Sequence, residues 1–126
     1  MAAQLKGGHM TKTYAEPDIH ARLAADLPHW RFADGTIQRT YQTASWKSTL
    51  MVVTTIGHLA EAAWHHPDLA VNYDSVTVKL STHSAKGITD FDFLLAAKIE
   101  EVILWRPGQP FSGTPGDARH AYIKYD

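Results

Sequence analysis

The sequence predicts a single small α+β domain in which helices pack on one face of an antiparallel sheet. Two long segments, 45–64 and 89–104, repeat apolar residues at the period of a helix. A hairpin pattern at 29–41 and an alternating strand at 74–83 supply the sheet. The order helix, strand, strand, helix, strand, helix, with room for one more strand before the last helix, is that of segregated layers. With 126 residues and no internal repeat, the chain fits one domain with one core.

The composition is that of an ordinary soluble protein. Hydrophobic residues make up 44% of the chain and charged residues 20%, and four tryptophans argue against disorder. A net charge of -1 predicts neither direct nucleic-acid binding nor binding to a membrane surface. No apolar run is long enough to span a membrane. The absence of cysteine excludes disulfides and thiolate chemistry and agrees with a cytoplasmic location.

Both ends of the chain differ from its middle. Residues 1–10 resemble an expression leader, with Met10 as the expected native start. Residues 11–105 hold the predicted domain. Residues 106–126 have the proline and glycine density of a loop. We expect this C-terminal extension to end in a short strand at 120–125 and to offer a surface for a protein partner.

The first predicted element is a short amphipathic helix at 17–27. Ile19, Leu23 and Leu27 recur there every four residues, so they form one apolar stripe. Pro17 suits the first helical turn, and the proline that follows Leu27 ends the helix.

A β-hairpin is expected next. Asp34 and Gly35 stand between two runs of β-forming residues, which is a strong signal for a two-residue hairpin turn. By the period of two, Trp30 and Phe32 share a face of the first strand. We expect Trp30 either in the core or as a stacking wall for a ligand.

The longest periodic segment is 45–64. Its length and alanine-rich end predict a helix, although the β-branched run 52–56 would also suit a strand. Thr43 or Ser45 can cap its start, and Pro67 requires it to end near the preceding pair of histidines. The predicted apolar stripe comprises Trp46, Leu50, Val53, Ile56 or Gly57, Ala60 and Trp64.

The last strand and the last helix follow from equally simple patterns. Residues 74–83 alternate apolar and polar side chains, which predicts a half-buried strand with His83 at its exit. The run Thr89-Asp90-Phe91-Asp92 matches the capping-box pattern, so Asp92 is expected to cap the last helix. The apolar stripe of that helix comprises Phe91, Leu94, Leu95, Ile99, Val102 and Leu104.

Three histidines and two carboxylates stand where these elements begin or end: Glu61, His65, His66, His83 and Asp92. Imidazole titrates near neutral pH, so one histidine can donate a proton while another accepts one. Glu61 lies four residues before His65 and therefore on the same helix face, which allows a contact between them. His66 is expected to face elsewhere. We expect the five side chains to converge on one acid–base pocket.

The same side chains also form an ordinary ligand set for a metal ion. Adjacent histidines in a turn seldom both reach one ion, however, and the HExxH spacing is absent. A serine nucleophile is disfavoured because the chain has no GxSxG elbow. The sequence therefore predicts acid–base chemistry without a metal.

Three motifs together resemble those of the pterin-4a-carbinolamine dehydratase family. They are E-x-x-x-H-H-P at 61–67, the strand end S-T-H at 81–83, and G-I-T-x-x-D at 87–92. The resemblance covers about residues 20–105 and implies a four-stranded antiparallel sheet with helices on one side. It also implies dehydration of 4a-hydroxytetrahydropterin to quinonoid dihydropterin in tetrahydropterin recycling. That hydro-lyase reaction uses neither a metal nor an organic cofactor.

The resemblance also implies roles for individual residues. His65, His66 and His83 would be catalytic: one protonates the departing 4a-hydroxyl, and another assists removal of the nitrogen proton. Glu61 and Asp92 would orient these histidines. The pterin pocket would be shaped by Trp30, Pro67, Thr82 and Ser84.

The chain departs from the family pattern in three places. After the proline, Asp68 is followed by Leu69 and Ala70, where members often carry an aromatic residue. The loop residues at 85 and 86 are only loosely similar, and the tail after residue 105 has no counterpart. These departures leave the substrate preference and the assembly open.

Two further expectations concern assembly. Members of the family form dimers and tetramers, and we expect at least a homodimer. The strand at 75–82, if it lies at a sheet edge, would offer unpaired backbone groups to a second copy. The alternative to the enzyme is a non-catalytic protein-binding or assembly module on the same fold.

Overall fold

The computed structural model describes residues 11–109, 111 and 121–125. The expected leader, residues 1–10, and most of the tail lie outside the described residues. The helices are α2 (Glu16–Asp26), α3 (Trp46–Ala63) and α4 (Asp90–Ile103), with one 3₁₀ turn, η1 (His83–Ala85). The strands are β1 (Arg31–Ala33), β2 (Thr36–Gln42), β3 (Asp68–Asn72) and β4 (Ser75–Leu80).

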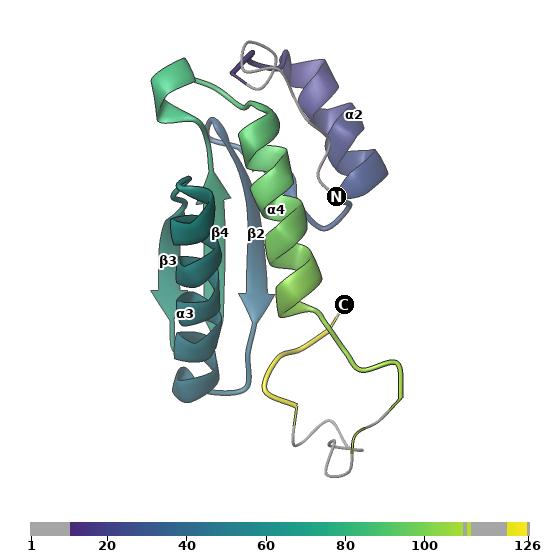
Figure 1. Ribbon diagram of the computed structural model, residues 1–126, viewed down its shortest axis with the longest axis vertical. Helices are drawn as coiled ribbons and strands as arrows, with labels where there is room; N and C mark the ends of the chain where they lie inside the picture. The colour runs from purple at the N-terminus through teal and green to yellow at the C-terminus, as the bar shows by residue number, and fades with distance from the viewer. Residues whose placement is uncertain (1–10, 110, 112–120, 126) are drawn as a thin grey trace.

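The four strands form one antiparallel sheet in the order β1-β2-β4-β3. Helices α3 and α4 pack against each other on one face of this sheet, and α2 packs beside β1 (Figure 1). The predicted α+β domain with a four-stranded antiparallel sheet is confirmed. The suggestion that the strand at 75–82 forms an edge is wrong, because β4 pairs with β2 on one side and with β3 on the other. The sheet edges are β1 and β3.

The hairpin turn forms where it was predicted. Asp34 and Gly35 connect β1 to β2, and their φ angles are 53° and 75°. A two-residue turn that follows the twist of the strands needs positive φ at both positions, which glycine and aspartate tolerate well. The turn fixes the register of β2, whose Ile37 and Tyr41 enter the core.

Helix α3 buries a face that shares only Ile56 and Ala60 with the predicted stripe. Ser45 caps its start by accepting a hydrogen bond from the Ser48 backbone N–H, as expected. Three members of the predicted stripe, however, are largely exposed: Trp46 by 48%, Leu50 by 42% and Trp64 by 75%. The buried face comprises Ser48, Thr49, Val52, Ile56 and Ala60.

This difference has a polar cause. Thr49 is fully buried, and its hydroxyl donates to the Tyr73 carbonyl oxygen at 2.9 Å and lies 2.6 Å from the Thr43 hydroxyl. Hydrogen-bonded threonines are buried at little cost, so apolarity alone misplaces the face. The stripe of α4 is likewise only partly right, since Leu94 and Val102 are exposed. The buried residues of α4 are Asp92, Phe93, Leu95, Ala96, Ile99 and Ile103.

A polar cluster ties α4 to the sheet. The Tyr41 hydroxyl donates to Glu100 Oε1 at 2.5 Å, the Trp30 indole N–H donates to the same oxygen at 3.3 Å, and Arg39 Nη1 lies 3.2 Å from Glu100 Oε2. Trp30 is 4% exposed and belongs to the hydrophobic core. Of the two positions expected for Trp30, the structure shows the core one.

Two peripheral segments complete the sheet. The edge strand β3 is mostly exposed, so it lacks the alternation that marks β4. The end of the chain returns to β2: Ile123 is 1% exposed and forms a bridge with Thr43, and the Lys124 N–H donates to the Gln42 carbonyl oxygen at 2.9 Å. In the described residues of the expected terminal strand, 121–125, this contact is a single bridge.

Candidate active site

Three segments meet at one end of the sheet. They are the C-terminal end of α3, the loop after β4 that contains η1, and the N-terminal end of α4 (Figure 1). A cavity of about 230 Å³ lies between the first two segments. Its lining comprises Trp64, His65, His66, Ser81, Thr82, His83 and Ser84. The structure thus brings the three predicted histidines to one cavity.

His65 is held by a fully buried carboxylate. Its Nε2 lies 2.7 Å from Asp92 Oδ1, and because an ionised carboxylate only accepts hydrogen bonds, the imidazole N–H is the donor. The other oxygen, Asp92 Oδ2, accepts hydrogen bonds from the Thr82 hydroxyl at 2.7 Å and from the Thr89 backbone N–H at 2.9 Å. Thr89 and Asp92 form the predicted capping box of α4. One carboxylate therefore caps the helix and orients the histidine.

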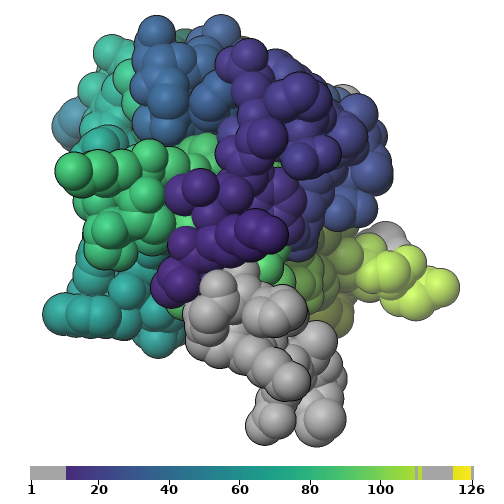
Figure 2. All heavy atoms as spheres, turned by 90° about the horizontal axis from the view of Figure 1, so that it is seen from above, coloured from purple at the N-terminus to yellow at the C-terminus, as the bar shows by residue number. Residues whose placement is uncertain are grey.

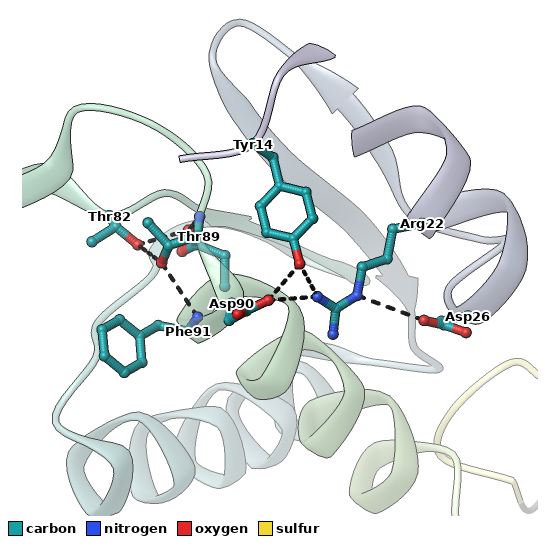
Figure 3. A network of polar contacts seen from close by, with 8 residues as sticks. Tyr14, Arg22, Asp26, Thr82, Thr89, Asp90 and Phe91 are labelled. Atoms are coloured by element: carbon teal, nitrogen blue, oxygen red, sulfur yellow. Dashed lines mark hydrogen bonds and ion pairs between the residues drawn. The ribbon is translucent and has the colours of Figure 1, made fainter. Parts of the chain in front are cut away.

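The threonine hydroxyls form an ordered chain behind this carboxylate. Thr82 uses its only hydroxyl hydrogen toward Asp92, so Thr89, whose hydroxyl oxygen lies 2.7 Å away, donates to Thr82. The Thr89 oxygen in turn accepts a hydrogen bond from the Phe91 N–H at 3.3 Å (Figure 3). Both threonines are buried, so the chain fixes the position of the Asp92 carboxylate from behind.

His66 pairs with a different carboxylate, Glu61, and this pair is more exposed than that of His65 and Asp92. The His66 Nε2 lies 2.9 Å from Glu61 Oε1, and the two side chains are 51% and 69% exposed. The predicted Glu61–His65 contact is wrong. Trp64 adopts the left-handed conformation, with φ 53° and ψ 45°, and ends α3. His65 therefore leaves the helix, and the spacing of four residues no longer places it above Glu61.

His83 is the third histidine of the cavity. It begins η1 and is exposed, and its imidazole has no hydrogen bond to the described residues, although its backbone carbonyl accepts one from the Lys86 N–H at 3.2 Å. His83 also lines a second cavity of about 400 Å³, which lies between its loop, the β1–β2 hairpin and the segment that leads into α2. Figure 2 shows the green η1 loop beside the blue hairpin and the purple N-terminal segment at this end of the molecule.

Of the remaining predicted site residues, some line the cavity and others do not. Ser84 lines the cavity, and Thr82 lines it while holding Asp92. Pro67 is half-buried and follows the histidine pair, outside the cavity lining. The structure does not bring Trp30 to the cavity, because its indole lies in the core against Glu100.

The N-terminal segment supplies a cluster that the sequence did not indicate. Arg22 Nη1 lies 2.6 Å from Asp90 Oδ1, the Tyr14 hydroxyl donates to the same oxygen at 2.5 Å, and Arg22 also contacts the Tyr14 hydroxyl (Figure 3). Burial and the hydrogen bond to Asp90 raise the pKa of Tyr14. Asp90 is the first residue of α4, so the cluster fastens the helix end that carries Asp92. Its members are 8 to 76 residues apart, and no local pattern links them.

The described part of the chain holds no candidate group of metal ligands and no candidate membrane-spanning helix. No group of three or more histidine, cysteine, aspartate or glutamate side chains is placed there to hold a metal ion. Nor is any helix among the described residues long and apolar enough to cross a membrane.

Comparison with known proteins points to one family. Residues 12–102 match the family model described as Pterin 4 alpha carbinolamine dehydratase. A protein of Aquifex aeolicus (strain VF5), assigned as a pterin-4-alpha-carbinolamine dehydratase, is 44% identical over 94 residues, which are 75% of this chain and 94% of that protein. A protein of Roseiflexus castenholzii with the same assignment is 43% identical over 88 residues, covering 70% and 94%.

A solved structure agrees with these sequence matches. The crystal structure of a transcriptional coactivator/pterin dehydratase from Brucella melitensis resembles this chain with a TM-score of 0.66 at 27% identity, covering 72% of this chain and 98% of that one. The chain belongs to the pterin-4a-carbinolamine dehydratase family. The family predicted from the three motifs is confirmed, and with it the class of enzyme, a hydro-lyase.

Proposed function

We propose that this protein dehydrates 4a-hydroxytetrahydropterin to quinonoid dihydropterin and water by histidine acid–base catalysis. Membership of the family supports the substrate class and the reaction. The observation that carries the mechanism is the cavity lined by three histidines, two of which are hydrogen-bonded to carboxylates. The reaction is not a net oxidation or reduction, so acid–base side chains supply the chemistry it needs and no organic cofactor is required.

The reaction asks for one proton donor and one proton acceptor. The C4a–O bond breaks, and the hydroxyl group takes up a proton and leaves as water. The N5–H bond gives up its proton, and its electron pair forms the C4a=N5 double bond. Two imidazoles on the walls of one small cavity can serve both ends of this elimination at neutral pH.

The environments of the histidines suggest a division of roles. His65 donates one N–H to the buried Asp92, and this carboxylate holds the ring in one orientation at the cavity wall. We therefore assign His65 as the proton donor to the leaving hydroxyl. His83, whose exposed imidazole has no hydrogen bond to the described residues, is assigned as the acceptor of the N5 proton. His66, supported by Glu61, would bind and orient the substrate.

The proposal is tested by stopped-flow measurement of dehydration with synthetic 4a-hydroxytetrahydropterin. The wild-type protein should exceed the spontaneous rate in buffer, and His66→Ala should show a clearly lower rate at equal protein concentration. A wild-type rate equal to that of buffer would refute the activity and favour a non-catalytic protein-binding module. A metal requirement is tested in parallel by assaying the protein before and after treatment with a chelator, and we expect equal rates.

We also propose that the chain assembles into at least a homodimer. The edge strand β3 has no strand partner on its outer side within the described sheet, and a sheet edge of this kind can pair with a second copy. Light scattering at micromolar concentration would show a mass of at least two chains, and a monomeric mass would contradict the proposal. We further propose that the protein acts in tetrahydropterin recycling in the cytoplasm. We also propose that the C-terminal tail binds a protein partner.

A further inference from the structure

Trp64 violates two local rules at once. It is one of three non-glycine residues with positive φ in the described part of the chain, at a helix end where glycine is the usual residue. Its side chain is also 75% exposed, although tryptophan is among the side chains that gain most from burial. Neither feature favours folding of this domain.

The contacts of Trp64 direct attention to the cavity. Its indole lines the same cavity as His65, His66 and His83. The indole and the His66 ring meet nearly at right angles, at 83°, with their centroids 5.0 Å apart. This edge contact uses little of the indole surface, so most of the ring remains available beside the histidines. Residues that break local rules without a structural gain are expected at functional sites.

We propose that Trp64 is a substrate-contacting residue whose indole stacks on the flat pyrimidine ring of the pterin. This inference rests on the proposed function, since it takes the pterin as the ligand of the histidine cavity. Stacking of a heteroaromatic ring on an aromatic side chain is favourable for any base with an exposed π-face. The left-handed backbone at Trp64 turns the chain out of the helix at the end of α3. This turn places the indole beside the cavity.

The test compares three variants of Trp64, to asparagine, phenylalanine and glycine, with Trp46→Asn as the matched control. Trp64→Asn removes the indole but keeps a residue that readily adopts the left-handed conformation. Trp64→Phe keeps an aromatic face. The control, Trp46→Asn, removes another exposed tryptophan at the opposite end of the same helix, where the side chain is 48% exposed. Trp64→Gly removes both the indole and the backbone penalty.

Each variant is measured for turnover of 4a-hydroxytetrahydropterin and for equilibrium binding of 7,8-dihydrobiopterin, a pterin that lacks the 4a-hydroxyl. We expect Trp64→Asn and Trp64→Gly to weaken binding and raise KM by about 5- to 30-fold, with a smaller change in kcat. Trp64→Phe should stay within about threefold of wild type, and so should Trp46→Asn. Thermal denaturation should show Trp64→Gly to be at least as stable as wild type, which a structural role would not allow.

The outcomes separate this inference from the proposed function. If the wild type binds and turns over the pterin and Trp64→Asn binds it equally tightly, the stacking role is overturned and the dehydratase activity still stands. A Trp64→Asn variant whose mass by light scattering falls while its affinity for the pterin is unchanged would also overturn it, by assigning the indole to an interface between copies. A wild-type protein that neither binds nor turns over pterins would overturn both proposals.

Discussion

Replacement of Asp92 by asparagine tests whether the Asp92 carboxylate orients His65 or only fills space in the core. Asp92 is fully buried, and its two oxygens accept hydrogen bonds from His65, Thr82 and Thr89 at 2.7, 2.7 and 2.9 Å. In Asp92→Asn the remaining carbonyl oxygen can still accept from the two threonines. The amide NH₂ then faces His65 Nε2, which must accept a hydrogen bond instead of donating one. The ring is held in the wrong tautomer, and the buried negative charge beside it is lost.

The magnitudes predict a folded but slow enzyme. A hydrogen bond to a charged group contributes about 1.5–3 kcal/mol and a neutral one about 0.5–1.5 kcal/mol, so we expect Asp92→Asn to lose about 1–3 kcal/mol of stability. That is tolerable for a domain with roughly 5–15 kcal/mol in total. Removing the function of a general acid or base lowers the rate by about 10²–10⁴, which corresponds to about 3–5 kcal/mol of transition-state stabilisation.

The assay is stopped-flow dehydration, paired with thermal denaturation of the same samples. Asp90→Asn is the matched control, because Asp90 is a carboxylate two residues away that contacts Tyr14 and Arg22 and no histidine. We expect this control to lose stability and to keep its rate within about threefold. An Asp92→Asn protein that is folded and retains the wild-type rate would refute the role assigned to this carboxylate.

Three further predictions follow from the same contacts. Glu61→Gln should lower the rate by less than about tenfold, since its pair with His66 is largely exposed and screened by solvent; a loss as large as that of Asp92→Asn would contradict this. Glu100→Ala should destabilise the fold by about 3 kcal/mol in urea denaturation, because it leaves the Arg39 side chain, only 3% exposed, without this ion pair. The folded protein holds the Tyr14 proton more tightly than the unfolded chain does, because burial and Asp90 raise its pKa. The free energy of unfolding should therefore fall as pH rises above about 10, and Tyr14→Phe should lessen that fall; an unchanged slope would count against it.

Features written in short stretches of sequence could be predicted well. The Asp34-Gly35 turn requires two positive φ angles, and the Thr89–Asp92 capping box satisfies backbone groups within one helical turn. Neither depends on distant parts of the chain. The motif of paired histidines before Pro67 likewise indicated the end of α3 and the cavity beside it.

Features that depend on distant contacts could not be predicted in the same way. The pairing of Glu61 with His66 instead of His65 follows from the left-handed conformation of Trp64, which turns the chain out of the helix before His65. The face of α3 is shifted because Thr49 finds buried acceptors in other segments. The edge strand β3 is mostly exposed and lacks an alternating pattern, so only its pairing with β4 identifies it as a strand.

The most direct test of the acid–base centre is the dehydration rate constant, kcat, of wild type, His65→Ala, His83→Ala and the double variant. If the two histidines serve opposite ends of one elimination, each single variant should lose about 10²–10⁴ in rate. The double variant should then be little slower than the slower single one, because groups that act as a unit are not additive. Single variants within about threefold of wild type would contradict the assignment of this cavity as the catalytic centre.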